Sequence, residues 1–187
     1  TMVFFLEEPS AEEMLKGILP KLLPPTITLR FVPFQGKQDM DKQLTAKLSG
    51  WQQPECSFIV LRDQDSGDCR VIKHHLSELC RRAGKENVMI RIACRELESF
   101  YLGDLAAVER GLDLRGLADK QNSRKYRDPD HLGSPSRELS QMTKNTYQKI
   151  AGSRAIAPHL DPGRNRSHSF IKLIEGIIKL TDNDHET

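Results

Sequence analysis

The chain has 187 residues, of which 37% are hydrophobic and 29% are charged, and its formal net charge is +2 at pH 7. These values fit a water-soluble domain, and the lack of any run of eighteen apolar residues or of an apolar leader predicts neither a membrane span nor a signal peptide. The four cysteines are spaced without a C-x-x-C pair, which disfavours structural zinc and a disulfide framework and indicates a reducing cytoplasm.

The first 110 residues are predicted to alternate strands with helices. Four compact runs of apolar or β-branched residues have the composition of strands, and they cover residues 2–6, 26–34, 58–61 and 87–94. The segments between them carry apolar residues at helical spacing. Ser10 and Glu13 are predicted to form a capping box at the start of the first helix, and Asp68 is predicted to cap the third.

Strands that alternate with amphipathic helices favour right-handed crossovers and a mainly parallel sheet. We therefore expect an α/β fold in which residues 1–110 form a four-stranded core flanked by helices. Residues 111–135 are rich in Gly, Asp, Arg, Lys, Asn and Pro, which predicts an irregular loop. Two helices, near 136–151 and 168–180, complete a mostly helical C-terminal extension, residues 111–187, that packs on the core.

Acidic residues follow three of the four predicted strands. Asp63 and Asp65 end the third strand, and the acids after the first and fourth strands are Glu7, Glu8, Glu96 and Glu98. The carboxyl ends of parallel strands lie at one edge of the sheet, so these side chains are expected to converge where α/β folds bind their ligands. Two unit charges about 4 Å apart repel by roughly 4 kcal/mol at an effective dielectric constant near 20. Mg²⁺ or Mn²⁺ would remove this repulsion, since both accept carboxylate and water ligands.

Each acidic pair alone also has a simpler explanation. Glu7 and Glu8 can begin an ordinary loop, and Glu96 and Glu98 can be first-turn helix residues that interact favourably with the helix dipole. The Asp-x-Asp sequence is more specific, because aspartate is a poor strand former and seldom lies buried without a partner. The predicted convergence of all three pairs at one edge is what favours a shared site.

The C-terminal part is more basic than the rest of the chain. Residues 144–172 hold six Lys and Arg against one Asp, which is equally typical of a solvated surface and of a patch that faces a phosphate backbone. This stretch contains Arg164, Arg166 and His168, which together with Lys37 are the candidate nucleic-acid-binding residues.

Short motifs of a distinctive kind are spread over nearly the whole chain. They are LEEPSAE (6–12), QGKQD (35–39), DQD (63–65) followed by Asp68-Cys69, ELESFYLGD (96–104), KYRDPD (125–130), and IAPH (156–159) with RNRS (164–167). Together they resemble one bacterial family of unknown function that is related to TOPRIM domains, which occur in topoisomerases, primases and OLD-type nucleases.

In the TOPRIM domain a catalytic glutamate follows the first strand and an Asp-x-Asp sequence follows the third. The resemblance therefore implies a catalytic role for Asp63 and Asp65 and for either Glu7 or Glu8. Glu8 is preferred, because Glu12 then follows at the TOPRIM-like four-residue spacing. The glycine that usually follows the TOPRIM glutamate is absent, so both glutamates remain candidates.

The resemblance also implies a function. We expect a Mg²⁺- or Mn²⁺-dependent nuclease that works in anti-phage defence beside an AAA- or ABC-type ATPase. The metal would be held by carboxylates from all three strand ends, namely Glu8, Asp63, Asp65, Glu96 and Glu98. DNA is the expected substrate, with RNA as an alternative, and a homo-oligomer is compatible with this role.

Two other functions fit parts of the same pattern. The chain would be a catalytically inactive module if the acids only held a structural ion while the protein bound nucleic acid or regulated an ATPase. A receiver-like phosphoacceptor also has paired acids after one strand. It needs a fifth strand ending in lysine, however, and no such strand is predicted after residue 110. It is therefore the least favoured of the three functions.

Overall fold

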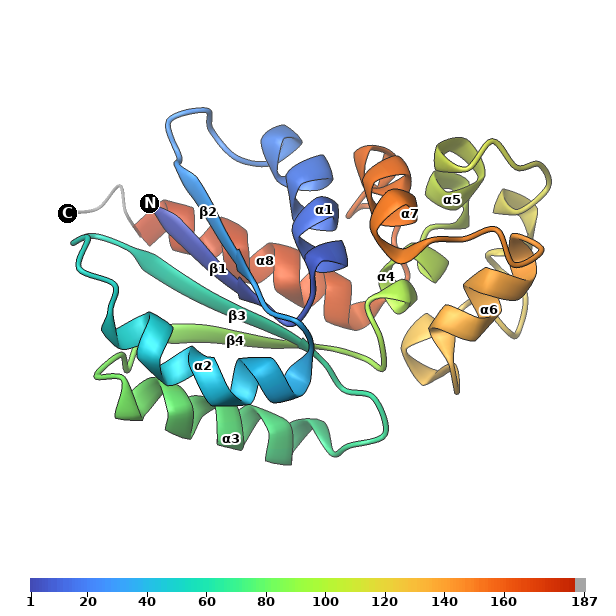
Figure 1. Cartoon of the computed structure of the whole chain (residues 1–187). Helices are drawn as coiled ribbons and strands as arrows, with labels where there is room; N and C mark the ends of the chain where they lie inside the picture. Colours follow the sequence, from blue (N-terminus) through green and yellow to red (C-terminus); the bar gives the residue numbers. More distant parts are fainter. Residues whose placement is uncertain (184–187) are drawn as a thin grey trace.

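The computed structural model describes residues 1–183 and confirms the α/β prediction. Its strands are β1 (Met2–Leu6), β2 (Leu29–Pro33), β3 (Ser57–Asp63) and β4 (Val88–Ala93). They form one parallel sheet in the order β2-β1-β3-β4, so β1 and β3 lie at its centre (Figure 1). None of the described helices is long and apolar enough to cross a membrane.

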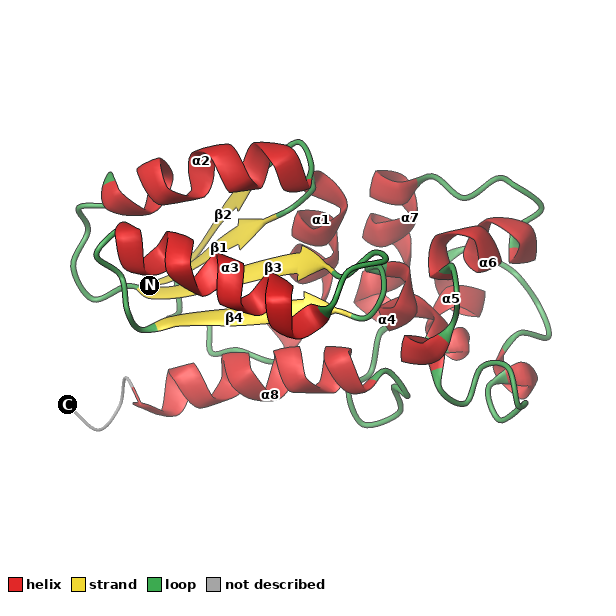
Figure 2. Ribbon diagram, turned by 90° about the horizontal axis from the view of Figure 1, so that it is seen from below, coloured by secondary structure: helices red, strands yellow, loops and turns green. Residues whose placement is uncertain are grey.

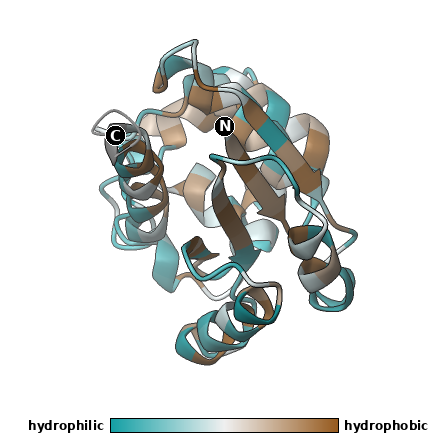
Figure 3. Cartoon of the chain, turned by 90° about the vertical axis from the view of Figure 1, so that its left-hand side faces the viewer, coloured by the Kyte–Doolittle hydropathy of each residue, from teal (hydrophilic) through white to brown (hydrophobic). Residues whose placement is uncertain are grey.

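Helices cover both faces of the sheet, which explains why β1 is apolar at every position. The first three are α1 (Pro9–Ile18), α2 (Lys37–Ser49) and α3 (Cys69–Arg82). Met2, Phe4 and Leu6 belong to a hydrophobic cluster shared with α1. Val3 and Phe5 belong to a second cluster shared with α2 and α3, which cover the other face in Figure 2. In Figure 3 the central strands are mostly brown, whereas the helices around them also carry teal residues.

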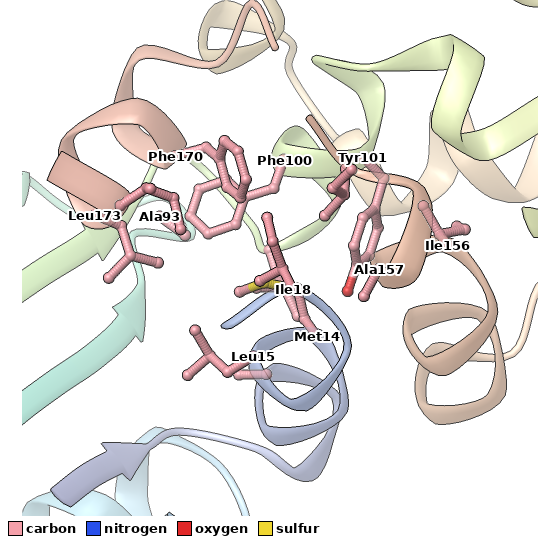
Figure 4. Close-up of a cluster of buried hydrophobic side chains, with 14 of the residues drawn as sticks. Met14, Leu15, Ile18, Ala93, Phe100, Tyr101, Ile156, Ala157, Phe170 and Leu173 are labelled. Carbon is pink, nitrogen blue, oxygen red and sulfur yellow. The ribbon is translucent and has the colours of Figure 1, made fainter. Parts of the chain in front are cut away.

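The second part of the chain is mostly helical, as predicted. The helices α4 (Glu98–Leu102) and α5 (Leu105–Gly111) follow β4 at the end of the predicted core, and the predicted extension holds α6 (Pro135–Met142), α7 (Lys149–Ile156) and α8 (His168–Asn183). Single 3-10 turns occupy Leu19–Lys21, Ala118–Lys120, Pro129–His131 and Ala157–His159. Helix α7 packs on α1, and α8 packs on β4. Figure 4 shows α1 side chains beside Phe100, Tyr101 and Phe170, so the extension and the core share one hydrophobic cluster.

The N-terminus of α1 differs from the prediction. The helix begins at Pro9, and Glu8 rather than Ser10 occupies the N-cap position, so the predicted capping box is wrong. Proline suits the first helical position because it has no N–H that needs a partner. The Ser10 hydroxyl instead donates a hydrogen bond to Glu8 Oε1 at 2.7 Å. The predicted cap of α3 is confirmed, since Asp68 Oδ1 accepts hydrogen bonds from two backbone N–H groups of the first turn, at 2.7 and 3.2 Å.

The prediction of one continuous helix near 136–151 is wrong, because two separate helices occupy this region. Helix α6 ends at Met142, and Lys144 and Asn145 follow with φ angles of +52° and +63°. This left-handed backbone conformation ends a helix. Helix α7 then begins at Lys149. The break matters for the site, because it places Lys149 in the first turn of a helix that lies beside α1. Strand β2 is also shorter than predicted, since residues 25–27 form a turn.

Candidate acidic site at the carboxyl edge of the sheet

The six predicted acidic residues follow or end β1, β3 and β4, whose carboxyl ends point toward α4 and α7 (Figure 2). Alternation along β3 decides which way each side chain faces. Ile59 and Leu61 belong to the α1 cluster, and Asp63 follows two residues later on the same side. Arg62 has the opposite parity and faces α2. Asp63 is thereby directed toward the helices of the C-terminal extension.

Asp63 lies among other carboxylates. Burial raises its pKa well above the usual value of 3.8, and the charges of Glu7, Glu98 and Glu8 raise it further, in that order. A backbone hydrogen bond with Leu97 opposes this rise only in part. The charged form of Asp63 is therefore disfavoured in the folded protein.

On the side of the site that faces α2, the acids have basic partners. Glu7 Oε2 accepts a hydrogen bond from a backbone N–H at the end of β3 at 3.1 Å and lies 3.8 Å from Arg62 Nε. The largely buried Arg62 also donates to Asp41 Oδ1 at 2.7 Å. Lys37 Nζ lies 2.7 Å from Asp65 Oδ2. Glu7 and Asp65 are thus held in place by side chains of β3 and α2.

On the side of the site that faces α7, the acids have fewer basic side chains as partners than on the α2 side. Glu98 is completely buried, and its Oε2 has no hydrogen-bond partner among the described residues. The Tyr147 hydroxyl lies 3.4 Å from the other oxygen, Oε1. Lys149 Nζ lies 3.1 and 3.2 Å from the two carboxylate oxygens of Glu8. Burial alone would lower the pKa of Lys149, but the charges of Glu98, Glu8 and Asp63 raise it. The single positive charge of Lys149 therefore interacts favourably with three carboxylates.

Sequence reasoning missed Lys149 and Tyr147 as parts of the site. Lys149 is one of six basic residues within 144–172, and nothing in its local sequence distinguishes it. Tyr147 precedes α7, and Gly152 leaves room for its ring, because a Cβ atom at that position would clash with the aromatic carbons. The first turn of α7 therefore places Lys149 beside Glu8, and the space at Gly152 lets Tyr147 reach Glu98.

Glu96 serves a different purpose from Glu98. Its Oε2 accepts a hydrogen bond from the backbone N–H of Ser136 at 2.7 Å, in the first turn of α6. A carboxylate at this end of a helix is stabilised by the helix dipole. The structure therefore favours Glu98 over Glu96 as the contribution of the β4 end to the site.

The four candidate nucleic-acid-binding residues have different environments. Lys37 is paired within the acidic site. Arg164 forms a two-pronged ion pair with the buried Asp104, in which Nε and Nη2 each lie 2.8 Å from a carboxylate oxygen. Arg166 and His168 are exposed and make no ion pair with any described residue. Arg164 therefore holds the loop before α8 against the first turn of α5.

We expect Arg164→Ala to lower the free energy of unfolding by about 2 kcal/mol, because Asp104 would remain buried without its counter-charge. The value lies at the low end for buried pairs, since the arginine itself is 38% exposed. Arg166→Ala is the matched control and should change stability by less than about 0.5 kcal/mol. Urea denaturation measures both variants, and equal stability would contradict a structural role for Arg164.

A divalent cation fits the donors of this site but not their present placement. Within the described residues, no group of three or more His, Cys, Asp or Glu side chains is close enough together to hold a metal ion. The donor chemistry is nevertheless that of a hard cation, since Glu8, Asp63 and Glu98 supply carboxylate oxygens and Glu98 Oε2 has no partner among residues 1–183. Binding would require these side chains to turn toward one another while Lys149 moves aside.

The fold and the site define a class of protein, namely a parallel α/β protein whose sheet edge carries a cluster of carboxylates. The chain belongs to the family described as a domain of unknown function (DUF4276), whose model matches residues 6–178. The prediction that it is a member of a family of unknown function is thereby confirmed. No curated protein and no solved structure matches the chain.

Proposed function

We propose that the chain is a TOPRIM-type nuclease that hydrolyses phosphodiester bonds with the help of Mg²⁺ or Mn²⁺. The observation that carries this proposal is the environment of Asp63, whose pKa is raised by burial and by Glu7, Glu98 and Glu8. A buried cluster of acids with an unpaired oxygen, here Glu98 Oε2, is unfavourable unless a cation offsets it. Sites of this kind more often serve a reaction than stability.

Asp63, Glu8 and Glu98 would hold the ion, with Asp65 at the margin of the site. When bound, the ion would stabilise the negative charge that develops on the phosphate during cleavage. The backbone of Glu98 would stay in place while its side chain turns toward the ion, because α4 packs into the hydrophobic cluster. Asp63, at the end of β3, would be a second ligand of the ion once the Asp63 carboxylate is ionised.

The hydrogen bonds favour Glu8 over Glu7 as the catalytic glutamate. Glu7 accepts from the backbone at the end of β3 and lies beside Arg62, so it keeps the Asp-x-Asp loop in position. Among described residues, the Glu8 side chain contacts the Ser10 hydroxyl and Lys149. Since a lysine side chain can move aside and the β3 backbone cannot, Glu8 is better placed than Glu7 to turn toward the ion or to transfer a proton to a leaving group.

The wider role rests on the motif resemblance alone. DNA is the proposed substrate, with RNA as the alternative, and the proposed setting is the cytoplasm, where the chain would be the effector of an anti-phage system. An AAA- or ABC-type ATPase would be its partner.

The test is cleavage of plasmid DNA, linear DNA and tRNA in Mg²⁺ or Mn²⁺, with the chain alone and with its partner ATPase. The parent is expected to cleave at least one of these substrates. The double variant Asp63→Ala/Asp65→Ala is expected to be inactive, because both acids of the Asp-x-Asp sequence are lost. Equal cleavage by the parent and by the double variant in Mn²⁺ would end this proposal.

A second candidate function is a module that binds nucleic acid or regulates an ATPase without catalysis. The ion pairs Lys149–Glu8 and Lys37–Asp65 favour it, because each lysine offsets the charge of a site acid from within the protein itself. Binding of nucleic acid without cleavage under all of these conditions, with the ATPase present, would select this function.

A further inference from the structure

A groove runs from Gln64, next to the acidic site, across the irregular loop that precedes α6. It consists of two adjoining cavities of about 430 and 510 Å³, which share Asp128 and His131 in their walls. Gln64, Arg95 and His168 line the first cavity. The second cavity lies farther along the loop and is lined by Arg124, Lys125, Arg127 and Leu132.

The first cavity begins at the Asp-x-Asp sequence itself. Gln64 is the central residue of that sequence and forms part of the wall. The backbone N–H of Asp65 donates a hydrogen bond to the carbonyl oxygen of Arg95 at 2.8 Å, which holds the wall against the site. A chain that lies in the groove would therefore contact Gln64, the residue between Asp63 and Asp65.

The groove offers unpaired positive charge. Arg95, Arg124 and Arg127 are exposed and make no ion pair with any described residue. Lys125 is also exposed but pairs with Glu138 at 2.6 Å, so it contributes less. Arginine is well suited to phosphate because its planar guanidinium can donate two parallel hydrogen bonds.

The two acids in the walls are each held by neighbouring groups. Asp130 accepts hydrogen bonds from the Ser167 hydroxyl at 2.6 Å and from the Ser169 backbone at 2.7 Å, so its charge caps the start of α8. Asp128 lies 2.9 Å from His131 Nδ1. The three arginines and Lys125 therefore outnumber the two acids, so the walls carry a net positive charge that favours an anion.

We infer that this groove binds the phosphate backbone of a nucleic acid and leads it to the acidic site. A chain of successive phosphates can contact both cavities at once, whereas a single small anion can occupy only one. The role of the groove in delivering a substrate rests on the proposed function. The new element is the assignment of phosphate binding to Arg95, Arg124 and Arg127. Arg164, which the sequence suggested as a nucleic-acid-binding residue, instead forms an ion pair with Asp104.

The experiment measures binding in EDTA, so that it does not depend on cleavage. Fluorescence anisotropy of a labelled 20-base-pair DNA duplex gives the affinity of the parent, of Arg124→Ala/Arg127→Ala, and of the control Lys42→Ala/Arg82→Ala. The control removes the same charge from exposed positions on α2 and α3. Thermal melting verifies that all three proteins fold.

The groove variant is expected to bind on the order of tenfold more weakly than the parent at 100 mM salt. The slope of log affinity against log salt should fall in magnitude by about two, because roughly 0.9 counterions are released per phosphate contact on duplex DNA. The control should match the parent. An unchanged slope in the groove variant, or an equal loss in the control, would overturn the inference.

A second measurement needs no substitution. Hydrogen–deuterium exchange of the parent chain should slow in residues 124–132 when the duplex is added in EDTA. Unchanged exchange in this segment, although the duplex binds, would place the contact elsewhere and overturn the inference. Binding in the groove without cleavage in Mn²⁺ would instead leave this inference standing and count against the proposed nuclease.

Discussion

Asp63→Asn is expected to abolish metal-dependent cleavage while making the fold more stable at pH 7. Loss of one carboxylate ligand removes roughly 4 kcal/mol of charge stabilisation in the transition state, or about a thousandfold in rate. The free energy of unfolding should rise by on the order of 2 kcal/mol, because the variant no longer places a charge beside Glu7, Glu98 and Glu8. An opposite effect on activity and stability is typical of a functional site rather than a structural one.

The pH dependence of stability gives an independent test of the same variant. Since the pKa of Asp63 is raised in the folded state, the folded protein holds a proton at pH values where the unfolded chain has released it. The contribution of this proton to the free energy of unfolding is fully present below pH 3.8, the usual pKa of aspartate. It is lost as the pH rises through the pKa of Asp63 in the folded protein. The stability advantage of Asp63→Asn over the parent should therefore be largest at neutral pH and disappear toward pH 3.8.

The effect of Mn²⁺ on stability and a control variant complete the test of Asp63→Asn. Mn²⁺ at about 100 times its dissociation constant should stabilise the parent by about 2.7 kcal/mol and should have little effect on Asp63→Asn. The exposed Asp119 provides the control, because Asp119→Asn should leave both stability and the Mn²⁺ effect unchanged. Urea denaturation at several pH values measures all three proteins. A variant that is less stable than the parent at pH 7 would contradict the proposed repulsion.

Lys149→Met is expected to destabilise the metal-free protein and to tighten binding of a divalent cation. The lysine is the cation shared by Glu8, Glu98 and Asp63, so its loss should lower the free energy of unfolding by about 1–2 kcal/mol at pH 7. The value is modest because the Lys149 side chain is 49% exposed and water screens the pair. Mn²⁺ no longer competes with an ammonium group in the variant, and its affinity should rise roughly tenfold, which corresponds to 1.4 kcal/mol.

Lys149→Arg is the matched control, because it keeps the positive charge beside Glu8. It should retain the stability and the Mn²⁺ affinity of the parent to within about twofold in affinity. Calorimetric titration with Mn²⁺ and thermal melting with and without the ion measure both effects. If Lys149→Met bound Mn²⁺ more weakly than the parent, the lysine would be a supporting residue of the metal site and not its competitor.

Several features of this protein follow from the sequence alone, because they depend on local patterns. Apolar runs alternating with amphipathic helices predict a parallel sheet, and strand ends in such a sheet share one edge. The positions of Asp63 at the end of β3 and of Glu8 after β1 can therefore be predicted without coordinates. The break between α6 and α7 is not, because residues 143–148 contain neither glycine nor proline and the chain turns there through Lys144 and Asn145.

Only the tertiary structure decides which charges neutralise the acids. Lys149 and Glu8 are 141 residues apart in the chain, and Arg164 and Asp104 are 60 apart. Arginine and lysine both occur throughout the basic C-terminal stretch. The local sequence does not show that Lys149 contacts a site acid whereas Arg164 holds the loop before α8. The packing of α7 on α1 selects Lys149, and the buried carboxylate of Asp104 selects Arg164. The sequence thus determines where the acids gather, since strand order is a local pattern, whereas their partners depend on long-range packing.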